Sequence, residues 1–80
     1  MRSKKLIEIA NQAVADYGFR QIALWSPDEM VERWGLSPAE EGVLTGALHE
    51  VLAALPVPVE PAEIPTEQAR FAELIWGALG

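Results

Sequence analysis

The residue types that could perform chemistry are few in this 80-residue chain, which contains one histidine and no cysteine. A histidine that relays protons or binds a metal on a helix needs a carboxylate or a second ligand about one turn away. The residues three and four positions from His49 are Thr45, Gly46, Leu52 and Ala53. None of them can supply that partner, so we expect a structural or surface histidine.

Two of the three serines and the glutamates near them are explained by helix capping. Ser26 and Ser37 each precede a proline and are followed three positions later by a glutamate, the signature of a capping box at a helix start. Glu40 and Glu41 then fall in a first helical turn, where the macrodipole favours negative charge. No glycine-rich phosphate loop is present. We therefore predict a protein that is not an enzyme and binds no cofactor or metal ion.

Charge is distributed unevenly along the chain. Residues 1–25 carry a net charge of +2 and residues 26–80 carry −8, which gives −6 in total. Affinity for nucleic acid comes from clustered Lys and Arg, so we exclude direct nucleic-acid binding. An acidic surface attracts a basic partner instead, including a protein that itself binds nucleic acid.

The distribution of apolar residues predicts a cytoplasmic location and no membrane contact. The longest apolar run is far shorter than the roughly 18 residues of a membrane span. Polar residues interrupt what would be the apolar core of a signal peptide. The absence of cysteine suits a reducing compartment.

Hydrophobic periodicity predicts an all-α fold, with residues 1–80 forming a single small bundle of three to four helices. The first helix is expected over residues 3–17. Gly18 would end it, because glycine enters the left-handed conformation without a steric penalty. Residues 19–25 fit a short buried helix and an extended connector equally well, and we leave both alternatives open.

The second half of the chain is organised around a helix predicted over residues 37–55, which follows a short helix over residues 26–34 closed by Gly35. One face of the longer helix is apolar and contains Leu44, Leu48, Val51 and Leu55. The opposite face is lined mainly by small residues, namely Ala39, Gly42, Gly46, His49 and Ala53. The helix would thus have almost no face left for solvent.

The spacing of Gly42 and Gly46 indicates a helix-packing site, because two glycines one turn apart let another helix backbone approach closely. Two alternatives remain open for the second helix. It belongs to the same chain, or it belongs to another molecule in a homodimer or a complex with a partner protein.

Prolines at four of the ten positions in residues 56–65 predict an extended, polyproline-like connector. A last helix is expected over residues 67–78, with Thr66 as its N-cap. Its apolar stripe contains Phe71, Leu74, Ile75 and Ala78. Trp76 does not lie on that stripe and is therefore either a contact on a second face or an exposed aromatic.

A protein-binding surface is the function that these features favour. It would be acidic and partly aromatic, with Trp76 as a second candidate anchor, since tryptophan is favoured at interface hot spots. Its predicted residues are Asp28, Glu29, Glu32, Trp34, Glu40, Glu41 and Trp76. We expect a small regulator or inhibitor, including the phage- or plasmid-type inhibitors that occupy a basic nucleic-acid-binding surface of a partner protein.

The stretch from Trp25 to Leu48, which contains SPDEMVERWGLSPAEEGVL, supports an alternative. It resembles the helix–Gly-Leu-Ser/Thr–helix core of the small α-subunits of protocatechuate 4,5-dioxygenase-type enzymes, and some peptide-maturation leader domains look similar. The resemblance implies an accessory subunit or leader-like domain that docks on a larger catalytic protein. The longer following helix and the Pro-rich tail depart from the family pattern. A helix-turn-helix reading fails, because the recognition helix would begin with Glu40 and Glu41.

Overall fold

The computed structural model describes residues 3–79, and every regular element in that range is helical. The elements are α1 (Lys4–Ala15), α2 (Tyr17–Trp25), α3 (Pro27–Trp34), α4 (Pro38–Thr45), α5 (Ala47–Ala53), the 3₁₀ turn η1 (Pro61–Glu63) and α6 (Ile64–Leu79). The all-α prediction is confirmed. The predicted count of three to four helices is too low for this part of the chain, because the helix predicted over residues 37–55 is divided in two and residues 19–25, left open above, belong to a further helix.

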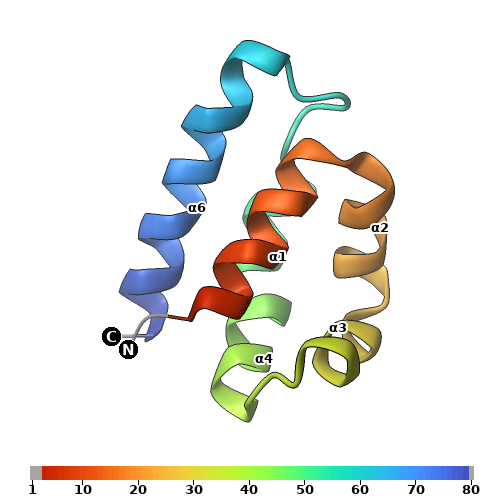
Figure 1. Cartoon of the computed structure of the whole chain (residues 1–80), viewed down its shortest axis with the longest axis vertical. Coiled ribbons are helices and arrows are strands. Elements are labelled where there is room, and N and C mark those ends of the chain that lie inside the picture. Colours follow the sequence, from red (N-terminus) through yellow and green to blue (C-terminus); the bar gives the residue numbers. More distant parts are fainter. Residues whose placement is uncertain (1–2, 80) are drawn as a thin grey trace.

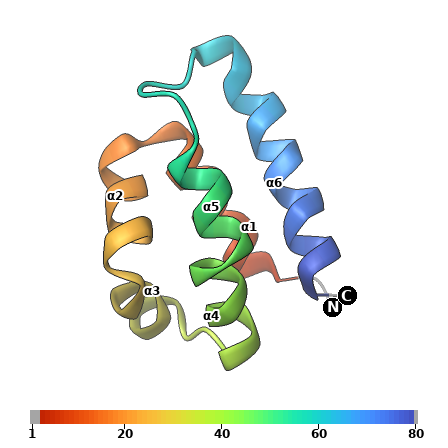
Figure 2. The ribbon, with the colours of Figure 1, turned by 180° about the vertical axis from the view of Figure 1, so that it is seen from behind.

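The other helices pack against α1 and leave one of its faces exposed (Figures 1 and 2). α6 and α2 lie on either side of α1, and α5 lies behind it in the view of Figure 1. The start of α1 and the end of α6 lie at the same end of the molecule. No helix within residues 3–79 has both the length and the apolar character needed to cross a membrane.

Asp16 separates α1 from α2, which corrects the predicted end of the first helix at Gly18. Its backbone is extended, with φ −129° and ψ 110°, and its N–H donates to the carbonyl of Gln12 at the end of α1. Its carboxylate accepts from the N–H of Phe19, 3.1 Å away, and so caps α2. An aspartate that satisfies a free N–H at a helix start stabilises a break there. Gly18 therefore lies inside α2, and residues 19–25 are helical.

Gly46 separates α4 from α5, so the predicted helix over residues 37–55 is two helices. Its φ of −107° and ψ of −104° depart from helical values. The apolar face is confirmed, since Leu44, Leu48 and Leu55 are buried. The predicted absence of a solvent face is wrong, because the small residues of the opposite face are exposed: Ala39, Gly42, Gly46 and Ala53.

The two predicted capping boxes have different outcomes. The hydroxyl of Ser37 accepts from the N–H of Glu40, and the carboxylate of Glu40 accepts from the N–H of Ser37, at 3.2 and 2.8 Å. Ser26 occupies the predicted N-cap position of α3, but its side chain makes no capping hydrogen bond. Gly35 ends α3 as predicted, in the left-handed conformation with φ 62°.

The last helix begins at Ile64, three residues before the predicted position and without Thr66 as its N-cap. Pro65 lies in its first turn, where the missing N–H would have no partner within the helix in any case. The extended connector is therefore shorter than residues 56–65. Phe71 and Ile75 are fully buried as predicted, whereas Ala78 is exposed.

The core lies where α1, α5 and α6 meet, and Met30 extends it to α3. Each such side chain contributes about 1.5–3 kcal/mol by its burial. The large side chains that are almost completely buried are Leu6, Ile9, Val14, Met30, Leu44, Leu48, Leu52, Phe71 and Ile75. This core fixes α2 against α5, and the groove described below lies between those two helices.

Candidate functional site: the groove between α2 and α5

Arg20 holds the inner part of the site in place. Only 2% of the residue is exposed, and its guanidinium donates to three carbonyl oxygens. Two belong to Ala13 and Val14 at the end of α1, at 2.9 and 3.2 Å, and the third to Pro56 in the connector, at 3.1 Å. The carbonyl end of a helix carries partial negative charge, so these acceptors compensate the buried cation. Arg20 thus joins α1, α2 and the connector.

A groove of about 240 Å³ lies between α2 and α5 and beneath the connector. Its inner surface is mixed, because the buried side chains of Leu24, Leu52 and Leu55 line it together with the polar groups of Arg20 and Gln21. The residues at its outer edge include Tyr17, Trp25 and Val57. In Figure 2, α2 and α5 run beside each other with the connector above them.

The outer edge of the groove holds most of the large apolar side chains that the described chain leaves exposed. Tyr17 is 45% exposed, Trp25 67% and Val57 60%. The fourth such residue within residues 3–79 is Trp76, which is 39% exposed and lies on α6. Clustered exposed apolar side chains mark interaction surfaces, whereas scattered ones are ordinary. The groove is therefore the strongest candidate site.

The two aromatic rings at the edge are held by neighbouring side chains. The indole N–H of Trp25 donates to the side-chain oxygen of Gln21, 3.0 Å away. The same ring meets His49 edge to face, with 5.5 Å between ring centroids. The guanidinium carbon of Arg20 lies 5.5 Å from the ring centre of Tyr17. Side chains held in this way lose less conformational entropy when a ligand binds.

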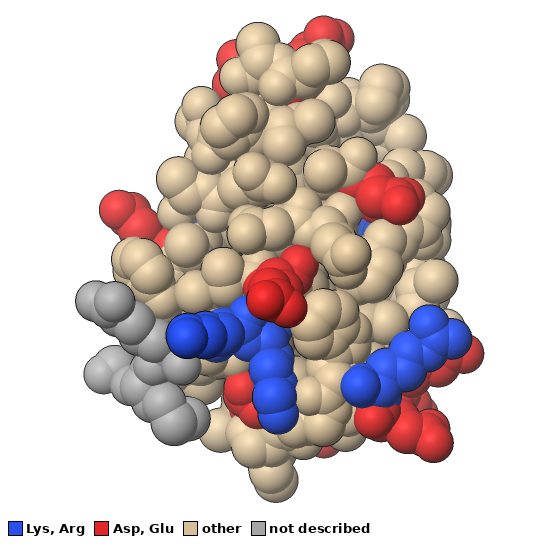
Figure 3. Space-filling model, viewed as in Figure 1, with Lys and Arg blue, Asp and Glu red and all other residues tan. Residues whose placement is uncertain are grey.

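The segments that form the groove expose negative charge only. Asp16, Glu50 and Glu60 are exposed on these segments, while the cation of Arg20 is buried. In the view of Figure 3, which is that of Figure 1, the exposed Lys and Arg side chains lie over the start of α1 and over α3 in the lower part of the molecule. The groove thus combines buried leucines and a buried arginine in its interior with exposed carboxylates on the segments that form it.

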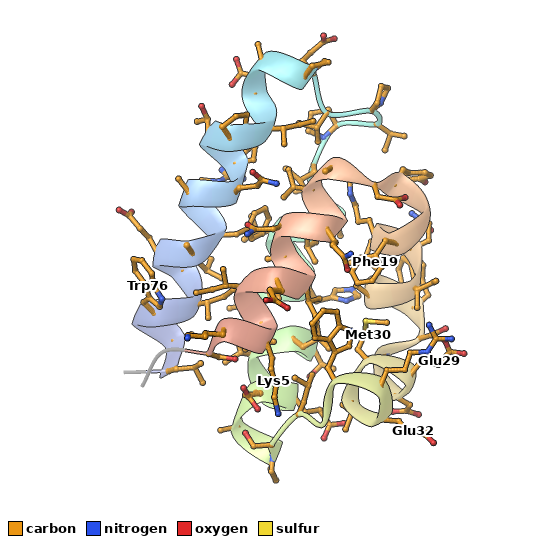
Figure 4. All side chains as sticks on the ribbon, in the orientation of Figure 1. Lys5, Phe19, Glu29, Met30, Glu32 and Trp76 are labelled. Carbon is orange, nitrogen blue, oxygen red and sulfur yellow. The ribbon has the colours of Figure 1, made fainter. Side chains whose placement is uncertain are left out.

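The predicted partner-binding residues do not form one surface. Asp28, Glu29 and Glu32 are exposed on α3. Figure 4 shows Glu29 and Glu32 at one edge of the molecule and Trp76 on α6 at the opposite edge. Trp34 is half-buried and packs against the core. Trp76 therefore lies apart from the acidic surface on α3, and its contact with a partner stays a prediction.

Glu40 and Glu41, also predicted for this surface, are less accessible than the carboxylates of α3. Glu41 is half-buried. Glu40 is 9% exposed, and besides its bond to the Ser37 N–H it accepts from the hydroxyl of Ser3, 2.5 Å away. The Ser3 hydroxyl and the Ser37 N–H stabilise the charged carboxylate and lower the pKa of Glu40, although burial opposes them. Glu40 thus links the start of α1 to the start of α4.

Gly42 and Gly46, the predicted helix-packing pair, lie on the exposed face of α4 and at the break before α5. A Cβ atom added at Gly42 would meet nothing within 4 Å, so no other element of the described chain packs there. A Cβ atom at Gly46 would lie 2.9 Å from the carbonyl oxygen of Gly42. Packing within the chain is therefore not the use of this pair. Contact with another molecule stays a prediction.

Sequence reasoning did not identify the groove. Trp25 and Tyr17 look like core residues in a sequence, and Arg20 looks like a surface residue. One signal was available: Arg20 is the only charged residue in the run YGFRQIALW, which indicates a buried or half-buried cation.

Neither the metal-binding residue types nor similarity to known proteins points to a further site. Within residues 3–79, no group of three or more His, Asp or Glu side chains is placed to hold a metal ion. His49 is half-buried beside Trp25. No protein-family model matches this chain, and no curated protein or solved structure is significantly similar to it.

Proposed function

We propose that this protein is a non-enzymatic binding module that holds another protein through the groove between α2 and α5. It would act as a small regulator or inhibitor of that partner. The observation that carries the proposal is that Tyr17, Trp25 and Val57, three large exposed apolar side chains, line one groove. Aromatic side chains beside a pocket are the residues that most often dominate the free energy of protein association.

The charge of the chain supports a partner with a basic surface. The net charge is −6, and Asp28, Glu29 and Glu32 form an exposed acidic surface on α3. The contact between Glu29 and Arg33 is 4.0 Å long and exposed, so it leaves these carboxylates available to a partner. Such a surface accelerates the approach of a basic protein, including one that binds nucleic acid.

A matched pair of variants tests the proposal. Trp25→Ala and Trp76→Ala each remove one exposed indole, but only Trp25 lines the groove. Partner proteins would be captured from host cells by tagged wild-type and variant protein and quantified by mass spectrometry. We expect Trp25→Ala to weaken capture of a specific partner about tenfold or more, and Trp76→Ala to retain it.

Equal capture by wild-type protein and Trp25→Ala would overturn the proposal, and circular dichroism checks that both variants remain folded. Capture measured at several salt concentrations tests independently whether charge contributes to partner binding. Capture that weakens as the salt concentration rises supports a basic partner surface, because exposed charges are screened within about 10 Å at 0.1 M salt. Capture that does not respond to salt removes charge from the proposal.

A further inference from the structure

We infer that the groove binds an amphipathic helix of the partner, with apolar anchor residues on one face and Lys or Arg flanking them. This inference rests on the proposed function and adds the chemistry of the bound segment. It follows from the length of the groove, its two walls and the sign of the charges around it.

The length of the groove matches two turns of a helix. Tyr17 and Trp25 lie at the two ends of α2, eight residues apart. At about 1.5 Å per residue this separation is about 12 Å. The apolar residues at positions i, i+3 or i+4, and i+7 of a bound helix span roughly 10 Å. The two aromatic side chains would therefore lie at either end of such a set of anchors.

The walls of the groove also suit a helix. They are formed by two helices, and the buried leucines between them leave about 240 Å³, which is room for one or two large apolar side chains. On the α5 side, Ala53 lines the groove and is exposed, so its small side chain lets a helix backbone come close. Residues 3–79 contain no strand edge to which a peptide could add as a further strand.

The charges favour a basic helix over an acidic one. Asp16 precedes Tyr17, Glu50 lies one turn before Ala53 on α5, and Glu60 follows the connector residue Val59. All three carboxylates are exposed. The one cation on these segments, Arg20, is buried and donates to three carbonyl oxygens, so much of its hydrogen-bonding capacity is used within the molecule. Opposite charges at the edge of an interface set specificity and the rate of association.

The experiment titrates ¹⁵N-labelled protein with synthetic peptides of about 18 residues, or five helical turns. The first has a Leu/Trp face flanked by lysines, and the second replaces those lysines with glutamates. The third has the composition of the first in an order that forms no apolar face. A fourth is a basic proline-rich peptide that cannot form a helix.

We expect only the first peptide to shift the amide signals of α2, α5 and the connector as a saturable set. Its dissociation constant should lie in the micromolar range. Trp25→Ala should raise that constant about tenfold and Val57→Ser a few-fold, while Trp76→Ala leaves it unchanged. Glu50→Lys should weaken binding more than Glu73→Lys, a matched charge reversal on the exposed surface of α6.

Other outcomes overturn the inference. One is that the acidic or proline-rich peptide binds the groove as tightly as the basic helix. Another is that Glu50→Lys and Glu73→Lys change the dissociation constant equally. A third is that the shifts of the amide signals are confined to α3. If the cellular partner is lost with Trp25→Ala but the basic helix does not bind, the bound segment is wrong and the proposed function stands. If the cellular partner is retained with Trp25→Ala, the proposed function itself fails.

Discussion

The junction between the starts of α1 and α4 and the groove between α2 and α5 place polar and apolar side chains in opposite ways. At the junction a carboxylate, Glu40, is buried and accepts hydrogen bonds from Ser3 and Ser37. At the groove an indole, that of Trp25, is two-thirds exposed. The junction satisfies its polar groups within the molecule, and the groove leaves apolar surface for something else to cover.

Whether a side chain is satisfied within the molecule or left exposed separates the residues that maintain the fold from the residues available to a partner. A charged side chain is buried only where several hydrogen bonds compensate its lost hydration, as around Glu40 and Arg20. Substitutions there should alter stability. An exposed aromatic side chain contributes little to the fold, so substitutions at the edge of the groove should alter binding.

The largest effect is expected for Arg20→Ala, because the buried guanidinium supports the groove from beneath. The substitution leaves the carbonyls of Ala13, Val14 and Pro56 without this donor and opens a cavity. We expect the free energy of unfolding, measured by urea denaturation, to fall by about 3 kcal/mol. Arg33→Ala, at an exposed arginine, is the control and should change it by less than about 0.5 kcal/mol. Equal effects of the two substitutions would contradict the role assigned to Arg20.

The next effect is expected for Glu40→Ala at the junction. The substitution removes the reciprocal half of the capping box at Ser37 and leaves the hydroxyl of Ser3 without its acceptor. The free energy of unfolding should fall by about 2 kcal/mol. Glu41→Ala, in the same helical turn but without these bonds, should cost about 0.5 kcal/mol through the helix macrodipole alone. A smaller loss for Glu40 than for Glu41 would refute the structural role of Glu40.

The pH dependence of stability gives a smaller and more specific effect at the same residue. The pKa of Glu40 is lowered in the folded state, chiefly by the hydroxyl of Ser3. Its contribution is therefore complete above the pKa of the unfolded chain and is lost as the pH falls through the lower folded value. The difference in unfolding free energy between wild-type protein and Glu40→Gln should shrink as the pH is lowered below about 4.5. A difference that stays constant from pH 7 to pH 3 would show that the carboxylate charge is not involved.

The sequence predicts the parts of this fold that depend on neighbouring residues. The capping box of Ser37 and Glu40, the helix end at Gly35 and the buried stripe that includes Leu44 and Leu48 are local patterns, and the structure confirms them. The break at Asp16 was missed because apolar periodicity continues through it. A local capping bond outweighs that periodicity.

The groove depends on contacts between segments that are distant in the sequence, so local sequence patterns could not predict it. Arg20 is buried because the end of α1 and Pro56, which is 36 positions away, supply acceptors. Trp25 is exposed because α2 turns its other residues, Ala23 and Leu24, toward the core. Neither fact is visible in residue type or local spacing, since apolar patterning alone assigns tryptophan to the interior.

Only a small loss of stability is expected for Trp25→Ala, and its size decides whether the residues of the groove are available for binding. The substitution removes the hydrogen bond to Gln21 and the edge contact with His49, both near the surface, so the unfolding free energy should fall by less than about 1 kcal/mol. Trp34→Ala should cost more, because that indole packs against the core. Both values come from urea denaturation monitored by circular dichroism. If Trp25→Ala destabilises the protein as much as Trp34→Ala, the groove residues belong to the fold and the separation drawn here fails. If the loss is small while partner capture falls tenfold, the exposed indole serves recognition.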